Sequence, residues 1–359
     1  MNNHDKVKVT VSGVSATMLF PLQGRAQLSK EYRSLFYDAK AVELVEKIDY
    51  DFSTDDMPFV GVMLNLIRRG YLLPMFSLGA LMAKQFDDKI KAYIAEHPRA
   101  SVVNLGAGLD ATFYRVDNGT IRWYDLDLPA AIDFRRQLLP EPDRVTYIAK
   151  SLLDPSWCED INTENGVFMI AEAVFQFFDE AQMKQFFSML ADHFPGGEIV
   201  FTTMSRSDGF SGWMNMFPPE QREAMRAVWV EAMKEWWEKV PAGQKDKAIT
   251  ALKTPTKPKG KEWADIEAWW NQLSDEENAE AMRDLVSSFS PIPIPGDRVG
   301  MWPPKDANEF TKWDSRITVI DQLSVSENIP RDSLSEDMQR FMDYFDKSGG
   351  WMNIFHLRV

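Results

Sequence analysis

Between residues 99 and 205, short apolar runs alternate with segments of helical periodicity, and this alternation constrains the fold more than any other feature. The pattern predicts five strands and two helices, with strands at 101–105, 121–125, 145–149, 167–171 and 198–203 and helices at 129–138 and 180–194. Strands that alternate with helices over short loops form a parallel sheet with helices on both faces. The sequence therefore predicts an α/β fold.

The rest of the chain falls into three further segments. Residues 1–98 are mainly helical, with apolar residues at helical spacing over 37–48 and 81–96. Residues 301–359 return to strand-like runs at 316–320 and 351–359, which we expect to complete the sheet as an antiparallel edge pair. Together with the 99–205 core, these segments leave residues 206–300 as an insertion into the α/β domain.

The 206–300 insertion is predicted to be helical and rich in tryptophan. A helix opens at Pro218-Pro219, and its apolar stripe reaches Val240. A linker follows at 245–261, then a helix from Trp263 and another from the capping box Ser274–Glu277, before the prolines at 291–295 break the chain. Nine of the twelve tryptophans lie between residues 213 and 313. The pairs Trp236-Trp237 and Trp269-Trp270 each place one ring off the apolar stripe, so the insertion either covers a bulky apolar substrate or forms a homodimer surface, and we favour the lid.

Charge and cysteine content exclude several classes of function. Lys and Arg number 40 against 54 Asp and Glu, a net charge of −14, which disfavours binding to nucleic acid or to anionic membranes. A single cysteine, Cys158, cannot form an intrachain disulfide, and one cysteine with four scattered histidines argues against a zinc site. The N-terminus lacks the apolar core of a signal peptide. We therefore expect a cytoplasmic protein that binds no metal.

Polar residues and glycines gather where the predicted strands end, which is where open α/β sheets bind their ligands. The first strand runs into Gly106-Ala107-Gly108 and then Asp110, the second ends in Asp125 and Asp127, and the fourth ends in Glu172. A glycine pair between a strand and a helix allows close approach of a ligand. An acid about twenty residues further on meets the ribose of a nucleoside cofactor in such folds, and both Asp125 and Asp127 qualify.

The sign of the charge helps to choose between two cofactors. Gly106-x-Gly108-x-x-Ala111 fits a relaxed dinucleotide fingerprint, so a nicotinamide-dependent oxidoreductase is one reading. Pyrophosphate, however, is anionic and binds at the positive end of a helix, whereas Asp110, Asp127 and Glu172 make this edge acidic. An acidic edge attracts the sulfonium and ammonium groups of S-adenosylmethionine. We therefore favour S-adenosylmethionine over NAD(P).

Four ordered motifs resemble the leucine carboxyl methyltransferase family, which includes the tetracenomycin-type polyketide O-methyltransferases. They are Val102–Asp110 with Phe113–Arg115, Trp123–Pro129, Phe168–Glu172, and the entry segment Thr17–Leu22 with Arg25 and Phe36–Ala41. The resemblance covers roughly residues 14–205 and the final strands. It implies a Rossmann-like class I methyltransferase fold, with a mostly parallel seven-stranded sheet, that binds S-adenosylmethionine.

The resemblance also implies a set of cofactor-binding residues. Gly106 and Gly108 approach the methionine part, Asp127 holds the ribose hydroxyls, and Glu172 faces the ammonium end. Ser151 and Leu152 lie beside the adenine, and Arg25 meets a carboxylate of the cofactor or the substrate. The set is completed by neighbours of these residues in the same motifs, Ala107, Asp110 and Leu128.

Two departures from the family pattern bear on the cofactor carboxylate. Met82 stands where relatives carry an Arg, and Lys84, Arg68 or Arg69 are the nearby cations that could replace it. The first motif continues Ala111-Thr112 where relatives have Thr-Arg. These changes motivate a third reading, in which the chain is a non-catalytic descendant that binds a partner through its insertion.

The leading hypothesis is an O-methyltransferase that acts on a carboxylate or hydroxyl of a small, hydrophobic or aromatic molecule. Methyl transfer is an in-line displacement in which the enzyme chiefly positions the two reactants. A carboxylate nucleophile needs no base, while a phenol gains from one. The sequence shows no Ser-His-Asp or Cys-His arrangement, so we name no catalytic residue.

Overall fold

The centre of the molecule is a seven-stranded sheet with the order β5-β4-β3-β6-β7-β9-β8. In this computed structural model, the described residues are 6–49, 73–204, 230–231, 233–274, 277–278, 280–281, 284, 306–347 and 352–359. The strands of the sheet are β3 (Ser101–Leu105), β4 (Arg122–Asp127), β5 (Val145–Ala149), β6 (Val167–Ala171), β7 (Glu198–Met204), β8 (Thr318–Ser324) and β9 (Met352–Arg358). The predicted α/β class is confirmed, and so are the bounds of six strands to within two residues, all but β8.

Strand direction separates the sheet into a parallel part and an antiparallel edge. Strands β3 to β7 pair in parallel, whereas β9 pairs antiparallel with both β7 and β8. The chain starts at β3, moves outward to β5, and returns to β6 on the other side of β3. Open α/β sheets bind their ligands beyond the carboxyl ends of the strands at such a change of direction, here β3 and β6, and we call this place the crevice.

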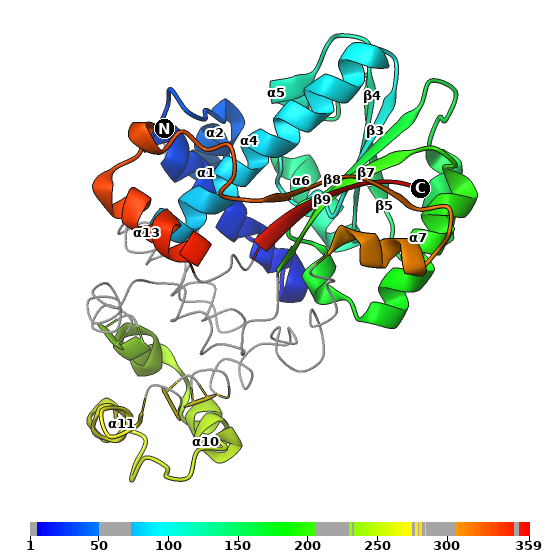
Figure 1. Ribbon diagram of the computed structural model, residues 1–359. Helices are drawn as coiled ribbons and strands as arrows, with labels where there is room; N and C mark the ends of the chain where they lie inside the picture. Colours follow the sequence, from blue (N-terminus) through cyan, green and yellow to red (C-terminus); the bar gives the residue numbers. More distant parts are fainter. Residues whose placement is uncertain are drawn as a thin grey trace.

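Helices cover both faces of the sheet, as Figure 1 shows. Those on one face include α4 (Leu73–Glu96), α6 (Pro129–Leu138) and α13 (Glu336–Lys347), whose apolar side chains share one core with Val102, Trp123 and Val200. On the other face, α7 (Glu180–His193) and the 3-10 turns η3 (Pro155–Asp160) and η5 (Ala307–Lys312) pack on Val103, Met169 and Phe201. None of the helices in the described ranges has the length and apolar character needed to cross a membrane.

The N-terminal segment packs beside the sheet rather than forming a separate body. It contains η2 (Gly13–Met18), α1 (Leu19–Glu31), α2 (Ala39–Lys47) and the two-residue parallel pair β1 (Val7–Lys8) and β2 (Ile48–Asp49). Helix α1 packs against α2 and α4, and α1, α2 and α4 lie together at one end of the molecule in Figure 1. This packing brings α1 to the crevice, because α4 leads directly into β3.

Two predictions about the later segments are wrong. The expected linker at 245–261 begins inside a helix, α10 (Ala242–Ala251), which has one fully buried residue, Ala248, and so lacks an apolar stripe. Helix α13 interrupts the expected return to strands, although Met338, Phe341, Met342 and Phe345 form a clear helical stripe. The antiparallel edge pair is confirmed. The start of the helix expected from Pro218-Pro219 and the break at 291–295 lie outside the described residues, whereas residues 230–231 and 233–239 in the later part of that helix are helical as expected.

Three tryptophans of the insertion belong to the hydrophobic core. Helix α11 (Trp263–Trp270) and the capping box are confirmed, since Ser274 and Glu277 each bond the other's backbone N–H. Trp237, Trp269 and Trp270 are all buried, and the indole N–H of Trp237 donates to the carbonyl of Lys261 at 2.8 Å. Both rings of the Trp269-Trp270 pair are therefore packed in the core, so the expectation of a ring free to cover a substrate is wrong for that pair.

Candidate functional site

The glycine loop after β3 is tied to the end of β4. Gly106 and Gly108 have φ values of 70° and 46°, a left-handed backbone that favours glycine. The N–H groups of Gly106 and Ala107 donate to the carbonyl of Leu126, and the N–H of Gly108 donates to Asp127 Oδ2 at 2.7 Å. Because these three donors are already bonded within the protein, they are not free to bind a pyrophosphate. The dinucleotide reading therefore loses its main support.

Gly106 is required for a second reason, which gives a testable prediction. A Cβ atom at this position would lie 2.6 Å from Val174 Cγ2, far inside a normal contact. We expect Gly106→Ala to destabilise the protein by about 2–4 kcal/mol, from left-handed strain and overpacking together. Chemical denaturation of the variant measures this cost. The double variant with Val174→Ala should recover the packing part, and a double variant no more stable than Gly106→Ala would contradict the contact.

Asp127 ends β4 and lies at the crevice. Its carboxylate accepts from the N–H of Gly108 and from the N–H of Leu128. The pKa of Asp127 is raised above its ordinary value, because the effect of burial exceeds the lowering effect of these two hydrogen bonds. The side chain of Leu128 is 41% exposed beside it. In the register of the sheet Asp127 lies opposite Ala149, so Ser151, two residues further on, follows the neighbouring strand end.

Ser151 and Leu152 differ in their surroundings. Ser151 is exposed, and its hydroxyl accepts from the N–H of Leu153. The side chain of Leu152 is buried in the core with Trp157, whose indole N–H donates to the Leu152 carbonyl at 3.0 Å. Ser151 therefore lies at the edge of the crevice, whereas the side chain of Leu152 lies in the core.

The other candidate acid, Asp125, belongs to the interior. It is fully buried and accepts from Trp123 Nε1 at 2.8 Å and from Arg135 Nη2 at 2.7 Å. Asn104 Nδ2 also donates to it. Burial raises the pKa of Asp125, opposed by the Arg135 guanidinium. Of the two acids that the spacing allowed, only Asp127 is at the edge of the sheet.

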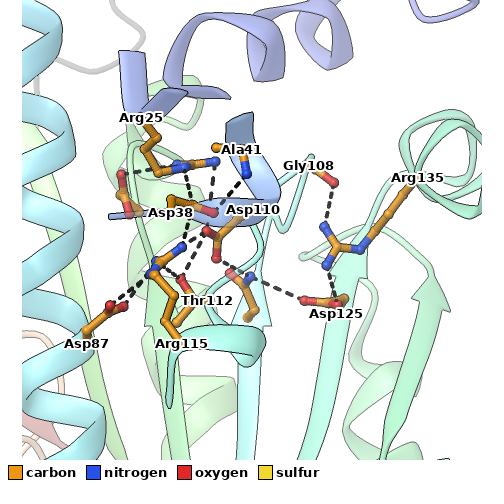
Figure 2. Close-up of polar contacts among 12 residues, drawn as sticks. Arg25, Asp38, Ala41, Asp87, Gly108, Asp110, Thr112, Arg115, Asp125 and Arg135 are labelled. Carbon is orange, nitrogen blue, oxygen red and sulfur yellow. Dashed lines mark hydrogen bonds and ion pairs between the residues drawn. The ribbon is translucent and has the colours of Figure 1, made fainter. Parts of the chain in front are cut away.

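Arg135 links that interior acid to the glycine loop. It extends from α6, is 2% exposed, and donates from Nη1 to the carbonyl of Gly108 at 3.0 Å (Figure 2). Its guanidinium also lies over the ring of Tyr147. The loop is thus held by β4 on its N–H side and by Arg135 on its carbonyl side. Sequence reasoning did not single out this residue.

Glu172 follows the end of β6, directly before a strained residue. Ala173 has a φ of 55°, a conformation that costs a residue other than glycine about 1–3 kcal/mol. The pKa of Glu172 is raised to about 7, because the effect of burial exceeds the lowering effect of the nearby Arg25 guanidinium. Backbone strain of this kind is concentrated at functional sites.

Arg25 comes from α1 and lies among three carboxylates (Figure 2). It is 4% exposed, and its guanidinium nitrogens lie 3.5 Å from Asp38, 3.8 Å from Asp110 and 3.8 Å from Glu172. These separations are too long for direct hydrogen bonds. Nε finds no hydrogen-bond partner among the described residues. A buried guanidinium whose carboxylate partners lie beyond hydrogen-bond distance keeps N–H donors for an anionic ligand.

Arg115 fastens the N-terminal segment to the site. Its guanidinium forms two hydrogen bonds with Asp87 of α4, at 2.8 and 3.0 Å, and one with Asp38 at 2.6 Å. It also donates to the hydroxyl of Thr112 at 2.6 Å. Asp38 in turn caps α2 by accepting from the N–H of Ala41. Sequence reasoning missed this arrangement, although Arg115 and Asp38 both stood in motifs that carry the family resemblance.

The arginines and acids around Arg25 form one ion cluster with a negative excess. We use this name for two arginines and four acids: Arg25, Arg115, Asp38, Asp87, Asp110 and Glu172. When all six are ionised, four carboxylates exceed two guanidinium groups by two charges. Asp110 stays acidic because Arg25 and Arg115 lower its pKa against the effect of burial. The cluster therefore attracts a cation.

The cation of the site comes from α1 and not from α4. Met82 is buried in the core. Lys84 pairs with Asp88 at 2.6 Å on the exposed side of α4, so it does not replace the absent Arg. Arg68 and Arg69 lie outside the described residues. Arg25 is the basic side chain that the described structure places among Asp110 and Glu172.

Comparison with known proteins supports the same reading. A family model described as leucine carboxyl methyltransferase matches residues 19–191. The chain is 30% identical over 199 residues to the tetracenomycin polyketide synthesis O-methyltransferase TcmP of Streptomyces glaucescens, a match that covers 54% of this chain and 67% of TcmP. It is 26% identical over 213 residues to the S-adenosyl-L-methionine-dependent methyltransferase dpfgK of Gibberella zeae, covering 55% of this chain and 68% of dpfgK.

Likeness to solved structures is more distant. The structure of PKMT2 from Rickettsia typhi matches with a TM-score of 0.38 and 10% identity, over 75% of this chain. This chain spans about half the length of that protein, since 51% of it is covered. The fold is defined by the order and direction of strands β3 to β9 and not by this distant likeness.

The family match begins at the first residue of α1 and ends within α7, so it includes the glycine loop, Asp127 and Glu172. From this match and from the identity to TcmP across two thirds of that protein, the chain belongs to the leucine carboxyl methyltransferase family, and its cofactor is S-adenosylmethionine.

Proposed function

We propose that this S-adenosylmethionine-dependent methyltransferase transfers the methyl group to a carboxylate or hydroxyl oxygen of a small, apolar or aromatic molecule. The observation that carries the proposal is the negative excess of the ion cluster beside the glycine loop, which suits a methyl donor with two positive groups. An oxygen acceptor of polyketide type is supported by the likeness to TcmP, whose name describes an O-methyltransferase of polyketide synthesis.

Arg25 and Glu172 suit the amino-acid end of the cofactor. Arg25 Nη1 and Glu172 Oε1 are 3.8 Å apart, so the two opposite charges lie side by side without a direct hydrogen bond. An α-carboxylate on the Arg25 guanidinium and an α-ammonium on the Glu172 carboxylate would satisfy both groups. Arg25 would then supply the guanidinium that relatives carry at the position of Met82. Gly106 and Gly108 would lie along the same end of the cofactor.

Asp127 and its neighbours suit the nucleoside end. The Asp127 oxygens each accept one backbone N–H and keep lone pairs for the two ribose hydroxyls. The exposed side chain of Leu128 would pack on the adenine, with Ser151 beside it. Ala107 and Asp110 would act through the loop, Asp110 by holding Arg25 and Arg115 in place.

The chain's residues would act by positioning the two reactants. S-adenosylmethionine supplies an electrophilic methyl group on a sulfonium that leaves as a neutral thioether. The ion cluster holds the donor end, and the fixed glycine loop sets its depth in the crevice, which raises the effective concentration of the reacting pair. A carboxylate acceptor needs no proton removed. A hydroxyl acceptor must lose its proton during the transfer.

The nature of the acceptor can be tested by labelled methyl transfer. The protein is incubated with S-adenosylmethionine carrying a labelled methyl group and with a panel of aromatic acids, phenols and aromatic amines. We expect label in an acid or a phenol, and mild alkali distinguishes a labile methyl ester from a stable methyl ether. Label that appears in the amines alone would replace the oxygen acceptor with a nitrogen acceptor.

Cofactor affinity should fall as the pH drops below about 7. Glu172 has a pKa of about 7, and an ammonium group binds to its ionised form, so protonation competes with binding by up to about tenfold per pH unit. Titration calorimetry with S-adenosylhomocysteine between about pH 5.5 and 8.5 measures this. Glu172→Gln should weaken binding and flatten the profile, while Glu180→Gln, which removes an exposed acid of α7, should change neither. An unchanged slope in Glu172→Gln would contradict the assignment.

A further inference from the structure

The chain leaves the sheet after β6 with the help of a side chain from β7. The last residue of β6, Ala171, pairs with Phe201 in the register of the two strands. The next residue of β7, Thr202, is buried, and its hydroxyl accepts from the N–H of Ala173 at 2.8 Å. A hydroxyl thus replaces the sheet carbonyl at the point where the two strands separate.

Ala173 needs such a restraint. Its φ of 55° is a left-handed conformation, and alanine lacks the polar side chain that lets asparagine adopt it, as Asn328 does elsewhere in the described chain. Downstream, Val174 packs against Gly106, and the 3-10 turn η4 (Phe175–Phe177) follows. Ala173 is therefore held between a hydrogen bond from β7 and a packing contact with the glycine loop.

We propose that Thr202 is a positioning residue, whose hydroxyl holds Ala173 in the left-handed conformation and so directs the Glu172 carboxylate toward Arg25. This inference rests on the proposed role of Glu172 at the ammonium end of the cofactor. If Ala173 relaxes to a right-handed or extended conformation, the peptide plane after Glu172 rotates. The carboxylate then loses its place 3.8 Å from Arg25.

The strand offers a matched pair of variants. Thr202→Val removes the hydroxyl and keeps a branched side chain that suits a strand. Thr203→Val makes the same change one residue later, at a buried hydroxyl that finds no hydrogen-bond partner among the described residues. We expect Thr202→Val to weaken S-adenosylhomocysteine binding about tenfold, the size of one neutral hydrogen bond. Thr203→Val and Thr202→Ser should bind within about twofold of the unmodified protein.

A double-mutant cycle tests the mechanism. Glycine adopts the left-handed conformation without strain, so in the Ala173→Gly background Thr202→Val should cost less than about threefold in affinity. An equal tenfold loss in both backgrounds would overturn the proposal, because the hydroxyl would then act by another route. The same holds if Thr202→Val binds normally, or if Thr203→Val binds as weakly as Thr202→Val. Circular dichroism confirms folding of each variant.

The two proposals fail in different ways. Unmodified protein that does not bind S-adenosylhomocysteine contradicts the assigned cofactor site as a whole. A second result contradicts the positioning role alone. In it, the unmodified protein binds S-adenosylhomocysteine with a pH profile set by Glu172, and Thr202→Val leaves that profile unchanged. We expect Thr202→Val to lose part of that pH dependence along with affinity, whereas a role confined to stability would lower the melting temperature and leave the profile as it was.

Discussion

Replacing Asp127 with asparagine should weaken cofactor binding by about a hundredfold. Its carboxylate is proposed to hold the ribose hydroxyls, and two hydrogen bonds to a charged group contribute about 3 kcal/mol. The change also disturbs the glycine loop, because Gly108 and Leu128 each donate an N–H to one of the two oxygens, and an amide can accept on one side only. Calorimetric titration with S-adenosylhomocysteine measures the loss.

Two controls separate the ribose contact from damage to the loop. Asp133→Asn removes an exposed acid from the following helix, and it should bind the cofactor as the unmodified protein does. The unmodified protein should bind the 2′-deoxy analogue of S-adenosylhomocysteine less tightly than it binds S-adenosylhomocysteine itself. Asp127→Asn should bind the two ligands with equal affinity. If Asp127→Asn discriminates between the two ligands as strongly as the unmodified protein, Asp127 does not contact the ribose.

Arg115→Met should destabilise the protein by about 3–5 kcal/mol, the usual cost of removing one partner from a buried ion pair. Asp38 and Asp87 would be left buried without their main cation. Unpaired buried carboxyl groups have raised pKa values in the folded state and are neutral at low pH. The deficit should therefore be largest above neutral pH and shrink toward pH 5. Urea denaturation at several pH values provides the measurement.

Arg144→Met provides the matched comparison. Arg144 also forms a two-pronged pair with an aspartate, Asp117, but at the surface. Such pairs contribute less than about 1 kcal/mol. Equal destabilisation by the two substitutions, or a deficit for Arg115→Met that does not change with pH, would show that the ion cluster does not hold the N-terminal segment.

The parallel strands and the strand-end residues could be predicted because local sequence determines them. Buried parallel strands are short continuous apolar runs, so the bounds that the sequence predicts for β3, β5 and β6 are those that the structure shows. Gly106, Asp127 and Glu172 follow those strands directly. Their convergence is a consequence of parallel pairing, and the family resemblance added Arg25.

The partners of Arg25 and Arg115 could not be predicted in the same way. Asp38, Asp87 and Arg115 come from three elements that are distant in the sequence, and each alone is equally compatible with an exposed cap or ion pair. Asp125 and Asp127 share one face of β4, so the choice between them depends on how far the buried part of the strand extends, and that is settled only when Trp123 and Arg135 are placed around Asp125. Helix α10 could not be predicted because it has no apolar stripe, and Ala248 is its one buried residue.

The most direct test of the central claim is calorimetric titration of the unmodified protein with S-adenosylhomocysteine and, separately, with NADH. An acidic edge built for a cationic methyl donor predicts one S-adenosylhomocysteine bound per chain with a dissociation constant in the micromolar range, and no binding of the dianionic NADH. Absence of S-adenosylhomocysteine binding at millimolar concentration, or one-to-one binding of NADH, would contradict the account.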